Sequence, residues 1–439
     1  MIDPVRTVAF DVLRAVDERD AYVNLILPGM LRERGIEGRD AAFATELTNG
    51  TLRRRGTYDA IINLAVSKGI ATVDPPVLDV LRLGAHQILS MRVPSHAAVS
   101  TCVDLVRSSV GHKPVAFTNA VLRKISQGDL DSWLARATRG RSKIEALSIV
   151  HSHPVWIIEA LNDALGGDWT ETEKLLAAQN EAPKVTLVAR PGLCAPDELP
   201  GGPGRLSPYA RYLDGGDPGA IPAIVEGRAG VQDEASQLVA IGLANAPVDG
   251  HDSRWLDLCA GPGGKAALLG AIAAQRGAEL VANEVQPHRA RLVEQSLRKL
   301  PNTTVTVHDG REGPWEPQSF DRVLVDAPCT GLGALRRRPE SRWRRLPSDL
   351  DQLVPLQKAL LVRALELVRP GGVVCYATCS PHLAETRAVV DAVLDGRSEV
   401  SAAEPVSWWP HIHGTDAMFS IILTKSPGGE SASTRAIRR

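Results

Sequence analysis

Hydrophobic residues recur at helical spacing through the first third of the chain. Val5, Val8, Val12 and Val16 would share one face of a helix over the first twenty residues. The segments that follow keep this period, are joined by short connections containing Gly or Pro, and contain no strand pattern. The pattern predicts an all-α bundle over residues 1–140, with further helices at 24–34, 39–54, 57–67, 76–91, 96–110 and 115–125.

The pattern changes over residues 141–230. Helical stretches at 142–150, 155–165 and 171–179 are followed by the strand-like run 184–190. A segment dense in Gly and Pro then extends from 191 to 222, and such density is typical of exposed loops. We interpret residues 141–230 as a small α/β connector domain.

From residue 231 onward, apolar runs of strand length alternate with helical segments. This alternation predicts a doubly wound parallel sheet, and so an α/β Rossmann-like domain over 231–427. We expect 418–423 to add a late edge strand, and the Ser/Gly/Arg-rich tail 428–439 to be disordered. The expected strands are 255–258, 280–283, 303–307, 322–325 and 373–377, and the expected helices are 265–276, 286–300 and 351–368.

Composition adds little to this picture. A chain of 439 residues can hold several domains, and a net charge of −1 leaves the partner open. Six cysteines without paired spacing indicate free thiols in a reducing cytoplasm, and the eleven histidines show no metal-ligand spacing. No apolar run reaches membrane-spanning length. The basic triplet Arg53-Arg54-Arg55 is either a solvated helix end, which is the commoner case, or a phosphate-contacting patch.

A glycine-rich loop follows the first strand of the predicted sheet. Glycines at a strand-to-helix turn let the backbone approach a ligand closely, near the positive end of a helix. Acidic residues follow the next three strands: Glu284, Asp309 and Asp326. These features favour a cofactor site over a simple glycine turn whose neighbouring acids cap helices. The loop itself reads Cys259, Ala260, Gly261, Pro262, Gly263, Gly264 and Lys265.

Pro262 interrupts the dinucleotide-binding fingerprint, so the loop leaves little room for a pyrophosphate. A nucleoside bearing an amino-acid tail fits better, and S-adenosylmethionine is such a molecule. Glu284 could accept both ribose hydroxyls, and Lys265 could hold the carboxylate of the tail.

Two cysteines, Cys329 and Cys379, stand just past two predicted strands. Because ligands gather at the carboxyl ends of strands in open α/β sheets, both thiols could face one substrate. A thiolate that adds to carbon 6 of a pyrimidine makes carbon 5 able to accept a methyl group. The residues alone leave open which cysteine attacks.

These motifs resemble those of the Sun/Fmu-type RNA cytosine-5 methyltransferases. The residues that carry the resemblance are the loop 259–265, the segment 326–331 with the arginines that follow, and Tyr376-Ala377-Thr378-Cys379-Ser380. Val231-Gln232-Asp233-Glu234 and His153-Pro154-Val155-Trp156 also look like this family. The helical amino-terminal region is similar to the NusB-like domain of its bacterial ribosomal RNA members. The chain departs from the family pattern at Gly261, at Thr330 and after Ser380, where only Glu385 keeps an acid.

The resemblance implies a role for each candidate residue. Cys379 would be the nucleophile, Cys329 would assist release of the product, and Asp326 would lie at the methyl donor and the cytosine edge. Glu284 would bind the ribose and Asp309 the adenine side of S-adenosylmethionine. The enzyme would be a cytoplasmic monomer that methylates carbon 5 of a cytosine in RNA, with small-subunit ribosomal RNA as the expected substrate and neither a metal nor a membrane involved. The alternatives are a DNA cytosine-5 methyltransferase that attacks through Cys329, and an RNA-binding assembly factor with a relic fold.

Six arginines lie between residues 336 and 345, with Trp343 among them. They could be a solvated charged loop, but their place beside the two candidate thiols favours a grip on the RNA backbone. We expect Trp343 to pack under this loop rather than to stack on a base.

Overall fold

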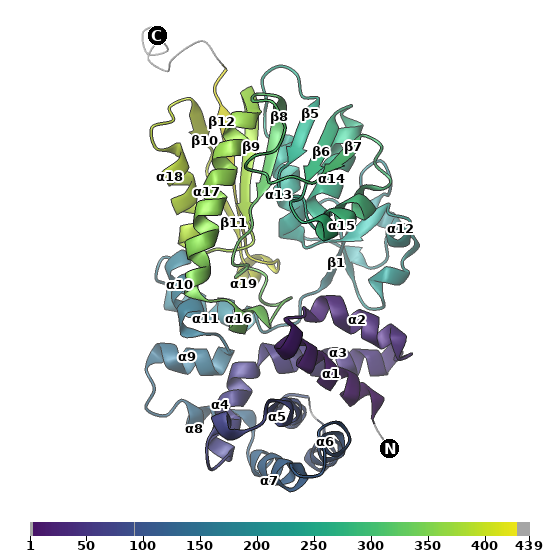
Figure 1. Cartoon of the computed structure of the whole chain (residues 1–439), viewed down its shortest axis with the longest axis vertical. Helices are drawn as coiled ribbons and strands as arrows, with labels where there is room; N and C mark the ends of the chain where they lie inside the picture. Colours follow the sequence, from purple (N-terminus) through teal and green to yellow (C-terminus); the bar gives the residue numbers. More distant parts are fainter. Residues whose placement is uncertain (1–2, 92, 428–439) are drawn as a thin grey trace. The chain divides into compact units, whose positions relative to one another are not determined.

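The computed structural model describes residues 3–91 and 93–427, so the predicted tail at 428–439 lies outside the described residues (Figure 1). The chain divides into two compact units. Unit 1 comprises Met1–Ala182 and Leu335–Leu346, and unit 2 comprises Pro183–Ala334 and Pro347–Arg439. This division into two units does not test the predicted domain boundaries at 140 and 230, which stay predictions. None of the described helices combines the length and apolarity that crossing a membrane requires.

Unit 1 is helical, as the spacing of apolar residues predicts. Its first helix begins at the N-cap Asp3, whose carboxylate accepts hydrogen bonds from the amides of Val5 and Arg6. The predicted face of this helix, including Val8 and Val12, is fully buried. The helices are α1 (Pro4–Arg19), α2 (Val23–Glu33), α3 (Gly38–Arg53), α4 (Arg55–Ala65), α5 (Pro75–Leu89), α6 (Ser95–Ser109), α7 (Val115–Ile125), α8 (Leu130–Ala137), α9 (Lys143–His151), α10 (Val155–Ala164), α11 (Trp169–Ala178) and α16 (Ser341–Arg344).

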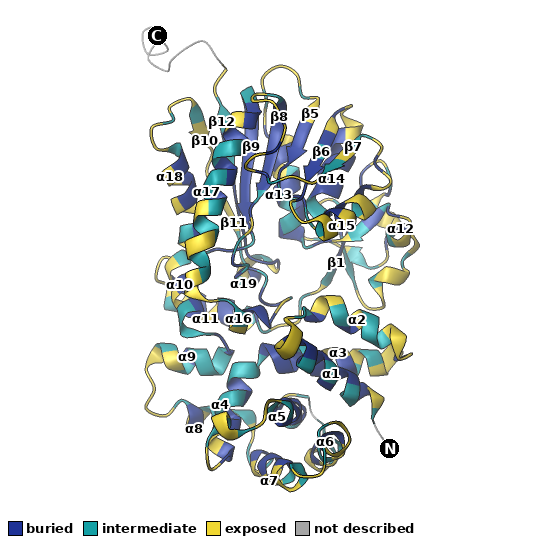
Figure 2. Cartoon of the chain, viewed as in Figure 1, coloured by how far each residue is buried: buried dark blue, intermediate teal, exposed yellow. Residues whose placement is uncertain are grey.

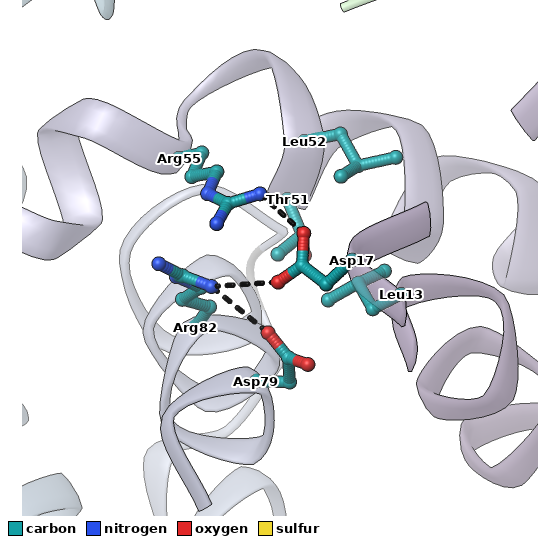
Figure 3. Close-up of a pocket in the computed structure, with 7 residues that line it drawn as sticks. All are labelled: Leu13, Asp17, Thr51, Leu52, Arg55, Asp79 and Arg82. Atoms are coloured by element: carbon teal, nitrogen blue, oxygen red, sulfur yellow. Dashed lines mark hydrogen bonds and ion pairs between the residues drawn. The ribbon is translucent and has the colours of Figure 1, made fainter. Parts of the chain in front are cut away.

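An ion-pair cluster joins α1, α4 and α5 (Figure 3). Arg55 donates to Asp17 at 2.6 Å, and Arg82 lies 2.9 Å from Asp79 and 3.6 Å from Asp17. Arg53, also in the basic triplet, is buried and donates to a backbone carbonyl. Neither alternative describes Arg53, because it is buried rather than solvated, and Arg55 is held in the ion pair with Asp17; both serve the packing of unit 1.

The arginine-rich segment that lies in sequence between Cys329 and the next long helix belongs to unit 1. The Arg342 side chain is fully buried there, and its guanidinium donates to the carbonyls of Arg53 and Gln179 at 2.8 and 2.7 Å and to Asn180 Oδ1 at 2.7 Å. Arg344 likewise donates to carbonyls near the end of α1. The predicted RNA grip is wrong for these two arginines, because backbone acceptors at helix ends occupy their donors.

Trp343 packs against the start of α4. A Cβ at Gly56 would come within 2.5 Å of the Trp343 ring, so the indole lies directly against this glycine. The side chain nevertheless keeps 36% of its surface exposed. The contact with Gly56 is the packing that was predicted for this indole.

Replacing Arg342 by methionine is expected to lower the free energy of unfolding by roughly 2–4 kcal/mol. Methionine fills much of the volume of the arginine side chain but leaves several buried acceptors without a donor, and each of these costs about 1–3 kcal/mol. Removing the buried charge offsets part of this loss. The pKa of Arg342 is already lowered to about 9, by burial first and then by Arg53 and Arg54. Urea unfolding followed by circular dichroism measures the change. The control Arg39→Met alters an exposed residue of α3 and should shift stability by less than about 0.5 kcal/mol; equal losses in both variants would contradict the assignment.

Unit 2 begins with a small antiparallel sheet in the order β2-β3-β1-β4. Its strands are β1 (Val185–Ala189), β2 (Gly202–Pro203), β3 (Ala210–Leu213) and β4 (Ala229–Val231), with α12 (Pro222–Val225) before the last. The prediction of loops over 191–222 is wrong for β2 and β3. Both strands are too short to show a period in the sequence, and they form because β1 offers a template for β3.

The large sheet of unit 2 has the order β10-β12-β9-β8-β5-β6-β7, with β11 also paired to β12. The strands β5 to β9 are parallel neighbours, and β12 is antiparallel to β9. The predicted α/β fold is confirmed, but β12 is not an edge strand because β10 and β11 pair beyond it. The strands are β5 (Arg254–Asp257), β6 (Glu279–Asn283), β7 (Thr303–Thr306), β8 (Phe320–Asp326), β9 (Val368–Thr378), β10 (Val400–Ala402), β11 (Val406–Trp408) and β12 (Met418–Lys425).

Helices cover both faces of this sheet, so most residues of its central strands are buried (Figure 2). Leu324 packs with α13 and α14, whereas its neighbours Val323 and Val325 pack with α17 and α18. Successive residues of a strand point to opposite faces, and a sheet buried on both faces needs an uninterrupted apolar run. The helices are α13 (Glu234–Asn245), α14 (Gly264–Gln275), α15 (Pro287–Leu297), α17 (Leu350–Leu367), α18 (Arg387–Leu394) and α19 (Pro410–His413).

Candidate functional site

Parallel pairing brings the predicted site residues to one edge of the large sheet. Asp326 at the end of β8 is paired with Ala377 of β9, and Asp257 at the end of β5 is paired with Leu324 of β8. The strand order then places, along this edge, the Cys379 loop, Asp326, the glycine loop after β5 and Glu284 after β6. The sheet thus collects the thiols and the acids on adjacent loops.

The glycine loop and Glu284 contact each other directly. The Gly261 amide donates to Glu284 Oε2 at 3.1 Å, and Arg289 donates to the Gly261 carbonyl at 2.6 Å. A Cβ at Gly261 would lie 2.0 Å from Glu284 Oε2, so the carboxylate sits where a side chain would otherwise be. The glycine at position 261, where the chain departs from the family pattern, therefore lets Glu284 approach the loop. Gly263 adopts φ +109° at the start of α14, a conformation that favours glycine.

Two polar residues at this edge were not among the predicted site residues. Asp257 is buried at the end of β5, and its Oδ2 accepts no hydrogen bond from any described residue. Burial, followed by the charge of Asp326, raises the pKa of Asp257 to about 8, so it is largely protonated at neutral pH. Asn283 ends β6 and donates to the carbonyls of Leu258 and His308, which ties the ends of β5 and β7 together. A polar residue that closes a buried strand was the available signal for both.

Lys265 and Asp326 form a close ion pair. Lys265 Nζ donates to Asp326 Oδ2 at 2.8 Å, and three quarters of the Asp326 side chain is buried. Burial lowers the pKa of Lys265, whereas the charge of Asp326 and the hydrogen bond to it raise this pKa. The net effect is a pKa above its usual value. Lys265 therefore stays charged beside the carboxylate.

Asp309 lies further along the edge, beyond β7, and is one-third exposed. Arg311 donates to its carboxylate at 2.9 Å and holds the pKa of Asp309 down at about 2. The acid is therefore ionised at every physiological pH.

The two predicted cysteines lie together. Cys329 Sγ and Cys379 Sγ are 3.4 Å apart and half-buried, and the six cysteines, all within the described residues, form no disulfide. The backbone holds this approach, because the Gly333 amide donates to the Cys379 carbonyl at 2.8 Å. A Cβ at Gly333 would come within 1.9 Å of the Ala417 carbonyl, so the close approach requires glycine. The hydrogen bond to Cys379, and then burial, raise the pKa of the Cys329 thiol well above its usual value.

A buried carboxylate, Glu385, supports both cysteine loops. It accepts hydrogen bonds from the Thr330 amide at 2.8 Å and from Gln357 Nε2 at 3.0 Å, and the Thr330 hydroxyl also donates to it. Thr330 Oγ1 in turn lies 3.0 Å from Ser380 Oγ. Because Thr330 follows Cys329 and Ser380 follows Cys379, Glu385 fixes the spacing of the two thiols.

Replacing Glu385 by alanine is expected to lower kcat about 100-fold while the affinity for S-adenosylmethionine stays within about twofold. The variant leaves the Thr330 amide and Gln357 without their acceptor, and a displacement near 1 Å at a reacting group costs about that factor. Single-turnover methylation of RNA and calorimetric titration of the cofactor measure the two quantities. Asp391→Asn, which alters an exposed acid of α18, is the control and should leave both unchanged. A fall in cofactor affinity as large as the fall in kcat would show that Glu385 supports the whole domain rather than the cysteine pair.

The residues of this edge fit S-adenosylmethionine in chemical type. Glu284 offers carboxylate oxygens for ribose hydroxyls, and Lys265 offers a cation for the carboxylate of the amino-acid tail. Asp257 supplies a buried oxygen without a partner, and Gly261 leaves no side chain over the loop. The edge thus has the acceptors, the cation and the open backbone that this ligand needs.

The mixed α/β sheet and this edge have the fold and the ligand groups of an S-adenosylmethionine-dependent methyltransferase. The sequence pattern of the family described as 16S rRNA methyltransferase RsmB/F matches residues 244–424, and that of the NusB family matches residues 3–127. The chain belongs to the RsmB/F family of RNA methyltransferases and carries a NusB domain at its amino terminus, which confirms the predicted resemblance. Its methyl donor is S-adenosylmethionine.

Similar proteins match the chain over almost its whole length. A protein of Mycobacterium tuberculosis H37Rv named "Putative methyltransferase Rv1407" is 51% identical over 97% of each chain. The "Ribosomal RNA small subunit methyltransferase B" of Salmonella typhi is 30% identical over 91% of this chain and 92% of its own. The crystal structure of PH0851 superposes with a TM-score of 0.80 at 22% identity, covering 97% of this chain and 99% of its own. This structure supports the fold alone.

Proposed function

We propose that the chain methylates carbon 5 of a cytosine in 16S ribosomal RNA through a covalent bond between Cys379 and the base. The observation that carries the proposal is the 3.4 Å approach of Cys329 and Cys379 at the sheet edge that also holds Asp326 and Lys265. A site for direct methylation of a nucleophilic ring nitrogen would need no thiol. Two thiols within contact distance suit a reaction that forms and then breaks a carbon–sulfur bond.

The chain's residues would act in a fixed order. The Cys379 thiolate adds to carbon 6 of the cytosine, and the electron pair displaced toward carbon 5 makes that atom a nucleophile. S-Adenosylmethionine supplies an electrophilic methyl group at this point. A water molecule or the Cys329 sulfur, in its thiolate form, then takes the proton from carbon 5, which restores the double bond between carbons 5 and 6 and expels the Cys379 sulfur as a thiolate. Cys329, whose sulfur contacts that of Cys379, assists this release.

The surroundings of Cys329 shift its pKa in one direction. The pKa of Cys329 is raised by its hydrogen bond to Cys379, by burial and by the negative charges of Glu385 and Asp326. This direction concerns Cys329 alone and favours its protonated form. The choice of Cys379 as the nucleophile rests on the family resemblance of its Thr-Cys-Ser motif, since the residues alone left it open.

The substrate cytosine must be unpaired or rotated out of its stack, since carbon 6 is inaccessible within a helix. Family membership supports small-subunit ribosomal RNA as the substrate. A single chain carries both thiols and all the proposed cofactor contacts, so we propose a monomer, acting in the cytoplasm where thiols stay reduced. Light scattering on the purified chain tests the oligomeric state.

Nucleoside mass spectrometry tests the reaction. Purified chain is incubated with S-adenosylmethionine and either a 16S ribosomal RNA transcript or duplex DNA, and the product is digested to nucleosides. The proposal predicts 5-methylcytidine in the RNA and no methylation of the DNA. Methylation on another atom, or of DNA, would refute it, and cofactor binding without transfer to any RNA would favour an assembly factor. Bisulfite sequencing of ribosomal and transfer RNA from a deletion strain then identifies the nucleotide.

A further inference from the structure

A cleft of about 540 Å³ in unit 2 lies outside the cysteine pair and its supporting network. The small sheet, α12, α15 and the loop before α14 form its walls. Exposed apolar side chains at its rim include Val225 and Val231, whereas its floor contains Arg190 and Gln232, each only 6% exposed. The cleft thus combines an apolar rim with a buried polar floor.

Two arginines bring positive charge to this cleft without a matching carboxylate. Arg190 donates to the carbonyls of Gly227 and Ser296, both at 2.7 Å, and its Nε has no acceptor among the described residues. Among the residues that the structure describes, Arg298, at the rim, donates to the carbonyls of Gln295 and Val225 alone. Burial, and then the charge of Arg298, lower the pKa of Arg190 to about 10, so Arg190 remains a cation at neutral pH. An anion in the cleft would offset this repulsion.

Gly227 brings the two guanidinium groups together. Its carbonyl accepts from Arg190, and a Cβ built on it would lie 2.7 Å from Arg298 Cζ. Its φ of +82° is also a conformation that favours glycine. A side chain at this position would separate the two charges, so the backbone is suited to keeping them close.

Gln232 adds an acceptor to these donors. Its Nε2 donates to Ser236 Oγ at 3.1 Å, while its buried Oε1 accepts no hydrogen bond from any described residue. A buried amide oxygen without a donor costs about 1–3 kcal/mol, which a hydroxyl of a ligand would recover. The floor therefore presents donors for an anion and an acceptor for a hydroxyl group.

We propose that this cleft binds one nucleotide of the RNA substrate, with its phosphate against Arg190 and Arg298 and its 2′-hydroxyl donating to Gln232 Oε1. The inference rests on the proposed function, because it takes RNA as the substrate. Val225 and Val231 would pack against the ribose, and the 2′-hydroxyl contact would favour RNA over DNA. Pro262 and Gly264 of the cofactor loop line the same cleft, so RNA bound here lies against that loop.

Arg298→Ala tests the phosphate contact. Its dissociation constant for a 16S ribosomal RNA transcript in about 0.1 M KCl should rise roughly 5-fold to 10-fold, and the slope of log affinity against log salt should fall by about 0.7 to 1. The affinity for S-adenosylmethionine should not change. Arg291→Ala is the matched control, since Arg291 is an exposed arginine of α15 outside the cleft, and it should leave both the affinity and the slope unchanged.

Gln232→Leu tests the hydroxyl contact. The wild-type chain should bind single-stranded RNA more tightly than DNA of the same sequence. In the variant, the affinity for RNA should fall while the affinity for DNA stays the same, so that part of the preference is lost. Photocrosslinking of the wild-type chain to RNA containing 4-thiouridine should label residues 224–232 or 295–298, independently of any effect on folding. Labelling only elsewhere, or an unchanged salt slope in Arg298→Ala, would overturn the assignment. If the wild-type chain still produced 5-methylcytidine, the proposed function would stand without the cleft.

Discussion

Cys379→Ala is expected to reduce methyl transfer to RNA by at least about 1,000-fold, with cofactor affinity within about twofold of wild type. Without the sulfur, carbon 5 of the cytosine is never activated, and the remaining site supplies binding alone. Single-turnover transfer of labelled methyl groups to a 16S ribosomal RNA transcript measures the loss. Cys194→Ala, which removes a buried thiol of the small sheet's core, is the control and should keep near wild-type turnover. Substantial turnover by Cys379→Ala would show that the role belongs to another group.

Cys329→Ala is expected to accumulate a covalent complex between the protein and RNA. Cys379 can still add to carbon 6, and the methyl group can still be transferred, but the step that expels the sulfur loses its assisting group. We expect most of the enzyme in a stoichiometric reaction to migrate with RNA on a denaturing gel, against a few per cent or less for wild type. The double variant with Cys379→Ala should form no adduct, because no nucleophile remains.

The opposite pattern would reverse the two roles. An adduct that forms with Cys379→Ala and not with Cys329→Ala would make Cys329 the nucleophile. That outcome corresponds to the mechanism of the DNA cytosine methyltransferases, which the sequence alone could not exclude.

Sequence patterns located the site because parallel sheets obey a simple rule. Apolar runs such as Val323 to Val325 marked strands buried on both faces, and the residues after those strands had to meet at one edge. Glu284, Asp326 and Cys379 could therefore be assigned to neighbouring loops. The distance between the thiols could not be predicted, since it depends on the pairing of Asp326 with Ala377 and on the Gly333 amide bond to the Cys379 loop.

The structural features that the sequence did not predict are ones that the spacing of apolar residues does not encode. β2 and β3 lie in a segment rich in Gly and Pro and have only two and four residues, which is too short for a pattern to appear. Arg342 lies in an arginine-rich segment that looks like an exposed loop, but its side chain is buried. Carbonyls at helix ends that are distant in sequence accept its hydrogen bonds. Asp257 is next to a recognised motif, yet its raised pKa arises from burial and from Asp326, which only the folded sheet brings near.

The most direct test of the central claim uses RNA in which 5-fluorocytidine replaces cytidine. Fluorine at carbon 5 cannot leave as a proton does, so the carbon–sulfur bond should persist even in the wild-type chain. Cys329 and Cys379 lie in different tryptic peptides, and mass spectrometry can assign the linked residue. Attack by Cys379 predicts a nucleotide attached to Cys379, and this nucleotide should carry the methyl group only when S-adenosylmethionine is present. A nucleotide attached to Cys329, or no covalent complex despite bound cofactor and RNA, would contradict it.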